Sequence, residues 1–270
     1  HTIHGRGPAI ATGIKLANPK LKVWQITGDG DALAIGGNHF IHAIRRNIDL
    51  NIVLFNNEIY GLTKGQFSPT SPTGIKTKSN PHGITDSPFI PAKLALGSGS
   101  TFIARVPDTN PKAMQAVFLA AENHRGTSLV EVLQNCVIFN DKCHGDVTGK
   151  EVKQDMQLWL EDGKPMIFGS ENNKGLILNG LKLEVVTIGE NGVTEGDLLI
   201  HNSKEQDITL HMMLSTMSAP EFPAAMGVIR AADELTYDEG MITQLEENIK
   251  TTKFKTSDDL FNSGDTWEVN

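Results

Sequence analysis

The sequence has little of what marks several large classes of protein. No apolar run approaches the ~20 residues of a membrane-spanning helix, and no signal peptide is visible. The formal net charge of −8 leaves no excess of basic residues for a nucleic-acid surface. Two cysteines, Cys136 and Cys143, are too few for a disulfide framework. These absences favour a cytoplasmic protein with no membrane or nucleic-acid partner.

The chain alternates short apolar runs with segments of helical spacing. Hydrophobic residues make up 39% of it and charged residues 21%, which is ordinary for a globular protein. This alternation predicts an α/β fold with a mostly parallel sheet. The expected strands span 23–26, 51–55, 101–106 and 128–133, and the expected helices span 8–16, 31–44, 92–95 and 111–124.

Polar residues follow the first two predicted strands. Gly28, Asp29 and Gly30 form a tight turn after the first, and Asn56 and Asn57 follow the second. Parallel neighbours end at the same edge of a sheet, so Asp29 and Asn57 are expected to lie side by side. Carboxylate and amide oxygens suit Mg²⁺, which takes further ligands from a phosphate. The glycines let the backbone approach such a phosphate closely.

The GDG turn alone is weak evidence, because acidic turns with glycine are common where strands end. The GDG turn followed by NN, with a strand before each, is far more specific and resembles the diphosphate motif of thiamine-diphosphate enzymes. That resemblance implies Mg²⁺ held by Asp29, Asn57 and the backbone carbonyl of Ile59.

Three further motifs narrow the resemblance: HGR at residues 4–6, YGLTKGQ at 60–66 and EVLQNC at 131–136. Together they resemble the β subunit of 2-oxoacid:ferredoxin oxidoreductases, and most closely the branch acting on 2-oxoglutarate. The likeness covers residues 1 to about 145 and implies a thiamine-diphosphate-binding fold. The residues that it places at the cofactor are His4, Gly30, Asp31, Gly61 and Leu62.

Lys64 lies where this family binds the far end of its substrate. An ammonium group there would pair with the second carboxylate of 2-oxoglutarate, whereas pyruvate would leave it idle. The alternative is a solvated loop lysine.

Cys136 matches the family position that gives one thiolate to a four-iron, four-sulfur cluster, which takes four cysteines. A lone buried cysteine is more often a small hydrophobic residue. The family's other three ligands lie before the HGR loop, and none is present here; Cys143 looks incidental. Because the sequence opens at His1 inside a motif, we expect that an N-terminal part of the protein is missing from it.

The resemblance also implies a reaction and its partners. The enzyme would decarboxylate 2-oxoglutarate oxidatively to succinyl-CoA, using coenzyme A and passing electrons to ferredoxin. The pyrimidine-binding domain would come from an α (or fused) partner subunit, because this sequence shows no second α/β domain.

Residues 146–270 carry no catalytic constellation. We expect an accessory segment over 146–232, with a helix near 150–160, a β-hairpin and subunit contacts. Val185–Ile188 and Leu198–His201 are the predicted hairpin strands, with Asn191-Gly192 as a turn between them. Residues 233–270 form a polar tail with a disordered end. The long loop at 68–91 is a lid or a subunit contact.

Three alternative functions stay open. A pyruvate or broad 2-oxoacid oxidoreductase would keep the same Mg²⁺ site. A non-oxidative thiamine decarboxylase would need no cluster cysteine. A non-catalytic subunit-contact module with relic cofactor loops is the third, and the intact Asp29, Asn57 and glycines weigh against it.

Overall fold

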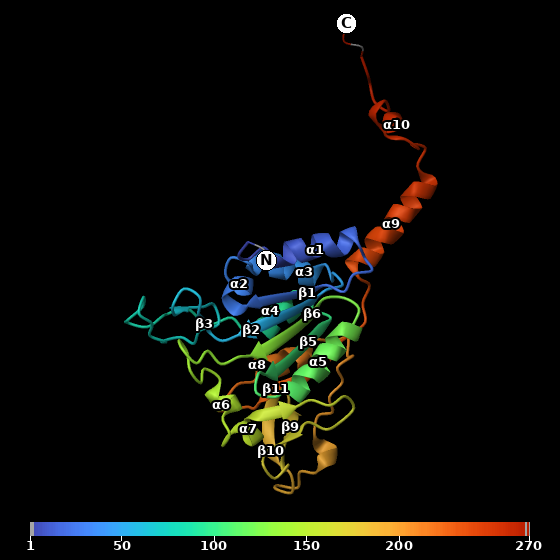
Figure 1. Cartoon of the computed structure of the whole chain (residues 1–270). Helices are drawn as coiled ribbons and strands as arrows, with labels where there is room; N and C mark the ends of the chain where they lie inside the picture. Colours follow the sequence, from blue (N-terminus) through green and yellow to red (C-terminus); the bar gives the residue numbers. More distant parts are fainter. Residues whose placement is uncertain (1–2, 268, 270) are drawn as a thin grey trace.

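The centre of the molecule is a six-stranded sheet with the order β1-β2-β6-β5-β11-β7 (Figure 1). The computed structural model describes residues 3–267 and 269. Strands β1, β2, β6 and β5 are mutually parallel, and β11 runs antiparallel to β5. The predicted α/β fold with a mostly parallel sheet is thus confirmed. The strands are β1 (Trp24–Gly28), β2 (Asn51–Asn56), β5 (Phe102–Pro107), β6 (Ser128–Leu133), β7 (Gln157–Trp159) and β11 (Ala224–Ala231).

Helices cover both faces of this sheet, which is why its central strands are buried along their whole length. Alternate strand residues such as Leu129 and Val130 enter different apolar clusters, one on each face. The first cluster includes residues of α1 (Gly7–Ala17), α3 (Gly37–Arg45), α4 (Pro91–Gly97) and α8 (Thr209–Thr216), and the second includes residues of α5 (Pro111–Asn123).

Two predicted helices differ from the observed elements. The helix expected over 31–44 is divided into α2 (Asp29–Leu33) and α3. At the bend, a Cβ on Gly36 would meet the carbonyl oxygen of Asp31 at 2.3 Å, so the close backbone approach requires glycine. The helix expected near 150–160 is reduced to α7 (Lys153–Met156), because the residues after it pair as β7 with β11.

The predicted β-hairpin exists, but on other strands. Strand β10 (Lys182–Thr187) pairs with β9 (Lys174–Asn179) through a turn at Gly180, and β8 (Ile167–Phe168) completes a three-stranded sheet. The expected pairing of Val185–Ile188 with Leu198–His201 is therefore wrong. Val185 faces Leu176 instead. Asn191-Gly192 does form a turn. The two strands of the hairpin, β9 and β10, both lie before this turn in the chain.

The segment predicted as accessory also contributes to the main sheet, since β7 and β11 both come from residues 146–232. After it, the chain extends away from the body as α9 (Tyr237–Thr251) and α10 (Ser257–Phe261), in red in Figure 1. Sequence patterning predicted no element there, although a capping box between Thr236 and Glu239 begins α9. Residues 268 and 270, part of the end expected to be disordered, lie outside the described residues.

The remaining elements are short. They are β3 (Ile59–Tyr60), β4 (Gln66–Phe67), α6 (Gly145–Thr148) and the 3₁₀ helix η1 (Glu195–Asp197).

Among the described residues, no helix combines the length and apolarity needed to cross a bilayer.

Candidate functional site

The predicted magnesium ligands gather where β1 and β2 end. Gly28 pairs with Phe55 in the parallel register, so Asp29 and Asn57 leave the same edge of the sheet. Ile59 follows at once in β3, and its N–H donates to Asn57 Oδ1 at 3.3 Å. The set consists of a carboxylate, an amide oxygen and a backbone carbonyl, all hard oxygen donors that fit Mg²⁺.

The carboxylate of Asp29 is buried, with 2% of its surface exposed. Its Oδ2 accepts hydrogen bonds from Ser68 Oγ at 2.5 Å and Thr70 Oγ1 at 2.6 Å. Both donors belong to the long loop after β4, so this loop fixes the orientation of the carboxylate. Both bonds go to Oδ2, which leaves Oδ1 as the oxygen that a cation can take.

His4 and Asp31, both predicted at the cofactor, contact each other. His4 Nδ1 lies 2.6 Å from Asp31 Oδ1, which also accepts from the N–H of Gly5 at 2.7 Å. Thr27 Oγ1 donates to Asp31 Oδ2 at 2.6 Å. Asp31 therefore fastens the HGR loop to the end of β1. A Cβ on Gly30 would meet the ring of Tyr60 at 2.2 Å, so the close packing of Tyr60 requires glycine there.

The loop 61–65 joins β3 to β4 and carries three more predicted site residues. Leu62 is 98% exposed, and Lys64 is also exposed, with a positive φ of 75°. At Gly61, a Cβ would lie 3.8 Å from Cys136 Sγ. The structure thus brings the predicted cluster ligand beside the predicted cofactor loop.

Sequence reasoning missed a buried polar chain along the same edge of the sheet, formed by Arg105, Glu131, Asn56, Thr70 and Asp29. Arg105 Nε donates to Glu131 Oε2 at 2.8 Å, and Asn56 Nδ2 donates to Glu131 Oε1 at 2.9 Å. Thr70 Oγ1 lies 2.9 Å from Asn56 Oδ1 and continues the chain to Asp29. One signal was available: a single charged residue interrupts each of the apolar runs 101–106 and 128–133.

Electrostatics hold Glu131 ionised within this chain. Burial raises the pKa of the Glu131 carboxyl, but the charge of Arg105 and the hydrogen bonds from Arg105 and Asn56 outweigh it and leave the pKa below its usual value.

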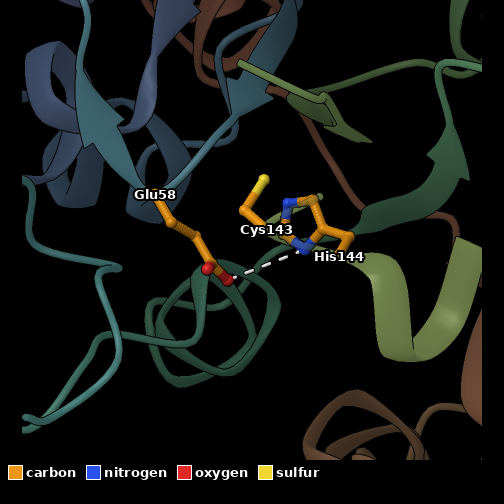
Figure 2. Close-up of side chains that lie close together, drawn as sticks. All are labelled: Glu58, Cys143 and His144. Carbon is orange, nitrogen blue, oxygen red and sulfur yellow. Dashed lines mark ion pairs between the residues drawn. The ribbon is translucent and has the colours of Figure 1, made fainter. Parts of the chain in front are cut away.

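A second group missed from the sequence consists of Glu58, Cys143 and His144 (Figure 2). Glu58 Oε1 lies 3.6 Å from His144 Nδ1, and His144 Nε2 lies 2.9 Å from the carbonyl oxygen of Asn56. Burial, and then the charges of Asp146, Asp29 and Glu131, raise the pKa of Glu58 to about 8. The three residues line a cavity of ≈ 260 Å³. Cys143, which looked incidental in the sequence, is therefore part of a polar cluster.

Comparisons with known proteins agree with the geometry of this edge. A family model described as "Thiamine pyrophosphate enzyme, C-terminal TPP binding domain" matches residues 1–132. The chain is 42% identical to 2-oxoglutarate oxidoreductase subunit KorB of Mycobacterium tuberculosis, over 100% of this chain and 72% of that one. It is 53% identical to 2-oxoglutarate synthase subunit KorB of Archaeoglobus fulgidus, over 50% of this chain and 51% of that one.

A solved structure is also similar. It is 2-oxoglutarate:ferredoxin oxidoreductase from Magnetococcus marinus with 2-oxoglutarate, coenzyme A and succinyl-CoA bound. The TM-score is 0.71 at 25% identity, covering 97% of this chain and 74% of that one. The likeness thus extends through the region after residue 145, and the chain belongs to the family of KorB subunits of 2-oxoglutarate oxidoreductases.

Proposed function

We propose that this chain is the thiamine-diphosphate-binding β subunit of a cytoplasmic 2-oxoglutarate:ferredoxin oxidoreductase. The enzyme converts 2-oxoglutarate and coenzyme A to succinyl-CoA and carbon dioxide and passes electrons to ferredoxin. The observation that carries the proposal is the convergence of Asp29, Asn57 and Ile59 beside the His4–Asp31 pair. Membership of the KorB family supports the choice of substrate.

Each residue at this edge then has a separate task. Asp29 Oδ1, Asn57 Oδ1 and the Ile59 carbonyl would hold Mg²⁺, while Ser68 and Thr70 keep Asp29 in place through Oδ2. Asp31 binds Nδ1 of His4. Nε2 of His4 would then be the ring nitrogen that contacts the cofactor diphosphate. Gly30, Gly61 and Leu62 complete the cofactor contacts. Thiamine diphosphate, when bound, supplies the nucleophilic carbon for the decarboxylation.

Cys136, which lies next to Gly61 at the cofactor loop, would supply one thiolate to the iron–sulfur cluster that passes electrons on. A four-iron cluster needs four thiolates, and Cys136 is the cysteine of this sequence that matches one of the family's ligand positions. The partner subunit supplies the pyrimidine-binding domain. The exposed apolar side chains of Leu62, Val137 and Ile138 beside the site support such a contact, because 72–98% of their surface is uncovered in the single chain.

The metal assignment is tested by Asp29→Ala in the assembled enzyme. Mg²⁺-dependent binding of thiamine diphosphate should be abolished, because the change removes a metal ligand. The chain should still fold, with a lower free energy of unfolding, because Ser68 and Thr70 lose their buried acceptor. Calorimetric titration measures cofactor binding, and circular dichroism checks that the variant is folded. Asp86→Ala, at an exposed acidic residue of the same long loop, is the control and should bind normally. Unchanged cofactor affinity in Asp29→Ala would contradict the assignment of Asp29 as a magnesium ligand.

The substrate is tested by Lys64→Ala. A charge-assisted pair with the distal carboxylate is worth roughly 1.5–3 kcal/mol, which is about ten- to a hundredfold in selectivity. The KM for 2-oxoglutarate should rise by that factor, while 2-oxobutyrate and pyruvate kinetics stay nearly unchanged. An equal loss for all three substrates would assign Lys64 to the loop or the cofactor. No change at all would make it a solvated lysine and reopen the pyruvate alternative.

A further inference from the structure

We propose that Glu58, Cys143 and His144 form a Zn²⁺ site that is separate from the magnesium site. The three side chains come from two segments, the turn after β2 and the residues that precede α6. Figure 2 shows the carboxylate of Glu58 directed toward the ring of His144, with the side chain of Cys143 beside them. Carboxylate oxygen, cysteine sulfur and imidazole nitrogen are each among the ligands that Zn²⁺ accepts. In the metal-free chain Cys143 Sγ donates to the carbonyl oxygen of Gln134 at 3.3 Å, and Zn²⁺ would displace that proton. A thiolate disfavours Mg²⁺ and Ca²⁺, which select oxygen ligands.

The spacing of the ligand atoms is close to that of a zinc site. All three atoms lie within 4.8 Å of one another, and Glu58 Oε1 and His144 Nδ1 are 3.6 Å apart. In a tetrahedral site with bonds of about 2.0–2.3 Å, neighbouring ligand atoms lie roughly 3.3–3.8 Å apart. Small side-chain rotations therefore bring the three atoms onto one ion without a change in the backbone.

The hydrogen bonding of His144 orients its other ring nitrogen toward Glu58. Its Nε2 faces the carbonyl oxygen of Asn56 at 2.9 Å, and since a carbonyl only accepts, Nε2 must carry the proton. Nδ1 therefore faces the carboxyl group of Glu58. A proton occupies the space between these two atoms in the metal-free chain, and Zn²⁺ would replace it. Zinc-binding histidines usually have such a carbonyl partner on their second nitrogen, which orients the ring.

The surroundings suit an ion that keeps one open position. Glu58 and His144 expose 17% and 11% of their side chains, so the site is largely shielded from water. The same three residues line the ≈ 260 Å³ cavity, which leaves room for a water molecule as the fourth ligand. Glu58 also adopts a positive φ of 57°, a conformation that is uncommon for a residue other than glycine and aims its side chain at the cluster.

The consequence of the ion would be to join two parts of the site. Glu58 stands between Asn57 and Ile59, and Cys143 follows Cys136 by seven residues. A Zn²⁺ bound to both segments would fix the magnesium-binding turn relative to the segment that carries Cys136. This positioning role rests on the proposed function, but the zinc site itself does not.

The test measures zinc in the chain purified in complex with its partner subunit. After chelator treatment and dialysis against buffer with Zn²⁺, elemental analysis should give one zinc per chain. X-ray absorption at the zinc edge, which is blind to iron and magnesium, should show one sulfur at about 2.3 Å and nitrogen or oxygen at about 2.0–2.2 Å. Cys143→Ser should remove the sulfur and weaken zinc binding by more than about tenfold, since even the loss of an outer partner costs roughly 10- to 100-fold.

Matched variants separate this site from the others. Cys136→Ser should keep the zinc and its sulfur, and Asp29→Ala should keep the zinc while losing the cofactor. Glu58→Gln, nearly identical in shape, should lose zinc even if Cys143→Ser fails to fold. The proposal is overturned if the wild-type chain retains no zinc, if Glu58→Gln binds it with full affinity, or if the zinc sulfur disappears in Cys136→Ser. Because zinc content is read without activity, failure here leaves the proposed function intact.

Discussion

Buried polar groups occur in two regions of this protein, and their partners differ. In the region formed by residues 146–232, the buried Arg230 and His201 bond mainly to backbone carbonyls, and Arg230 also contacts His211 Nδ1 at 3.1 Å. Arg230 donates to the carbonyl oxygens of Ser100 at 3.1 Å and Glu205 at 2.5 Å, and His201 Nε2 donates to that of Val228 at 2.9 Å. At the edge of the sheet where β1 and β2 end, buried side chains bond to one another instead.

This difference separates a structural role from a functional one. A side chain that bonds to fixed backbone carbonyls holds two segments of the chain together. At the sheet edge, the negative charges of Asp146, Asp29 and Glu131 act on Glu58, and Arg105 is paired with Glu131. Burial and this surplus of negative charge raise the pKa of Glu58 to about 8. A bound cation relieves such a surplus of negative charge, which supports the proposed magnesium site.

The largest loss of unfolding free energy is expected from Glu131→Gln, which changes a fully buried carboxylate of the sheet edge. Arg105 would keep its charge without a counter-charge, and loss of one partner of a buried pair costs about 3–5 kcal/mol of unfolding free energy. Urea denaturation measures the loss. The double variant Arg105→Met/Glu131→Leu is the control and should lose less, because no uncompensated charge is left. A loss below about 1 kcal/mol in Glu131→Gln would show that the pair is not a stabilising link.

A smaller effect, of about 2–3 kcal/mol, is expected from Arg230→Met. The change leaves the carbonyls of Ser100 and Glu205 without a donor while keeping most of the side-chain volume. Urea denaturation should show this loss, and calorimetric titration should show unchanged affinity for thiamine diphosphate in the folded complex. Weaker cofactor binding in Arg230→Met would contradict the division between a structural and a functional region.

The smallest effect concerns pH and His201. Burial lowers the pKa of His201, and among the described residues its Nδ1 is buried without a hydrogen-bond partner. The unfolded chain therefore binds a proton below about pH 6.5 that the folded chain resists. Stability should be full above this pH and fall as pH drops toward the lower folded pKa.

His201→Gln is the matching test, because it retains an N–H donor and does not titrate in this range. The difference between the urea midpoints at pH 7.5 and pH 5.5 should be smaller in the variant than in the wild type. Part of the slope should persist, because burial also lowers the pKa values of His124 and His211. An identical pH slope in the variant and the wild type would exclude His201 as a contributor.

The sequence by itself determined the elements whose signals are local. Apolar runs and helical spacing predicted the four parallel strands and helices such as α5, because the pattern of a buried element repeats within that element. The placing of Asp29 beside Asn57 was equally predictable, since parallel neighbours in a sheet end at one edge. The resemblance to 2-oxoacid oxidoreductases depended on this pairing of GDG with NN, and the family comparisons confirm it.

Only the tertiary structure decided the contacts between distant segments. The residues of β7 looked helical but pair with β11, and β10 pairs with β9 rather than with the segment after the Asn-Gly turn. Arg105 meets Glu131 through the register of β5 with β6. His144 reaches the end of β2 although it follows Asn56 by 88 residues. In each case the energy of burial and of cross-strand bonding exceeds the local preference, and no local pattern records which distant segment supplies the partner.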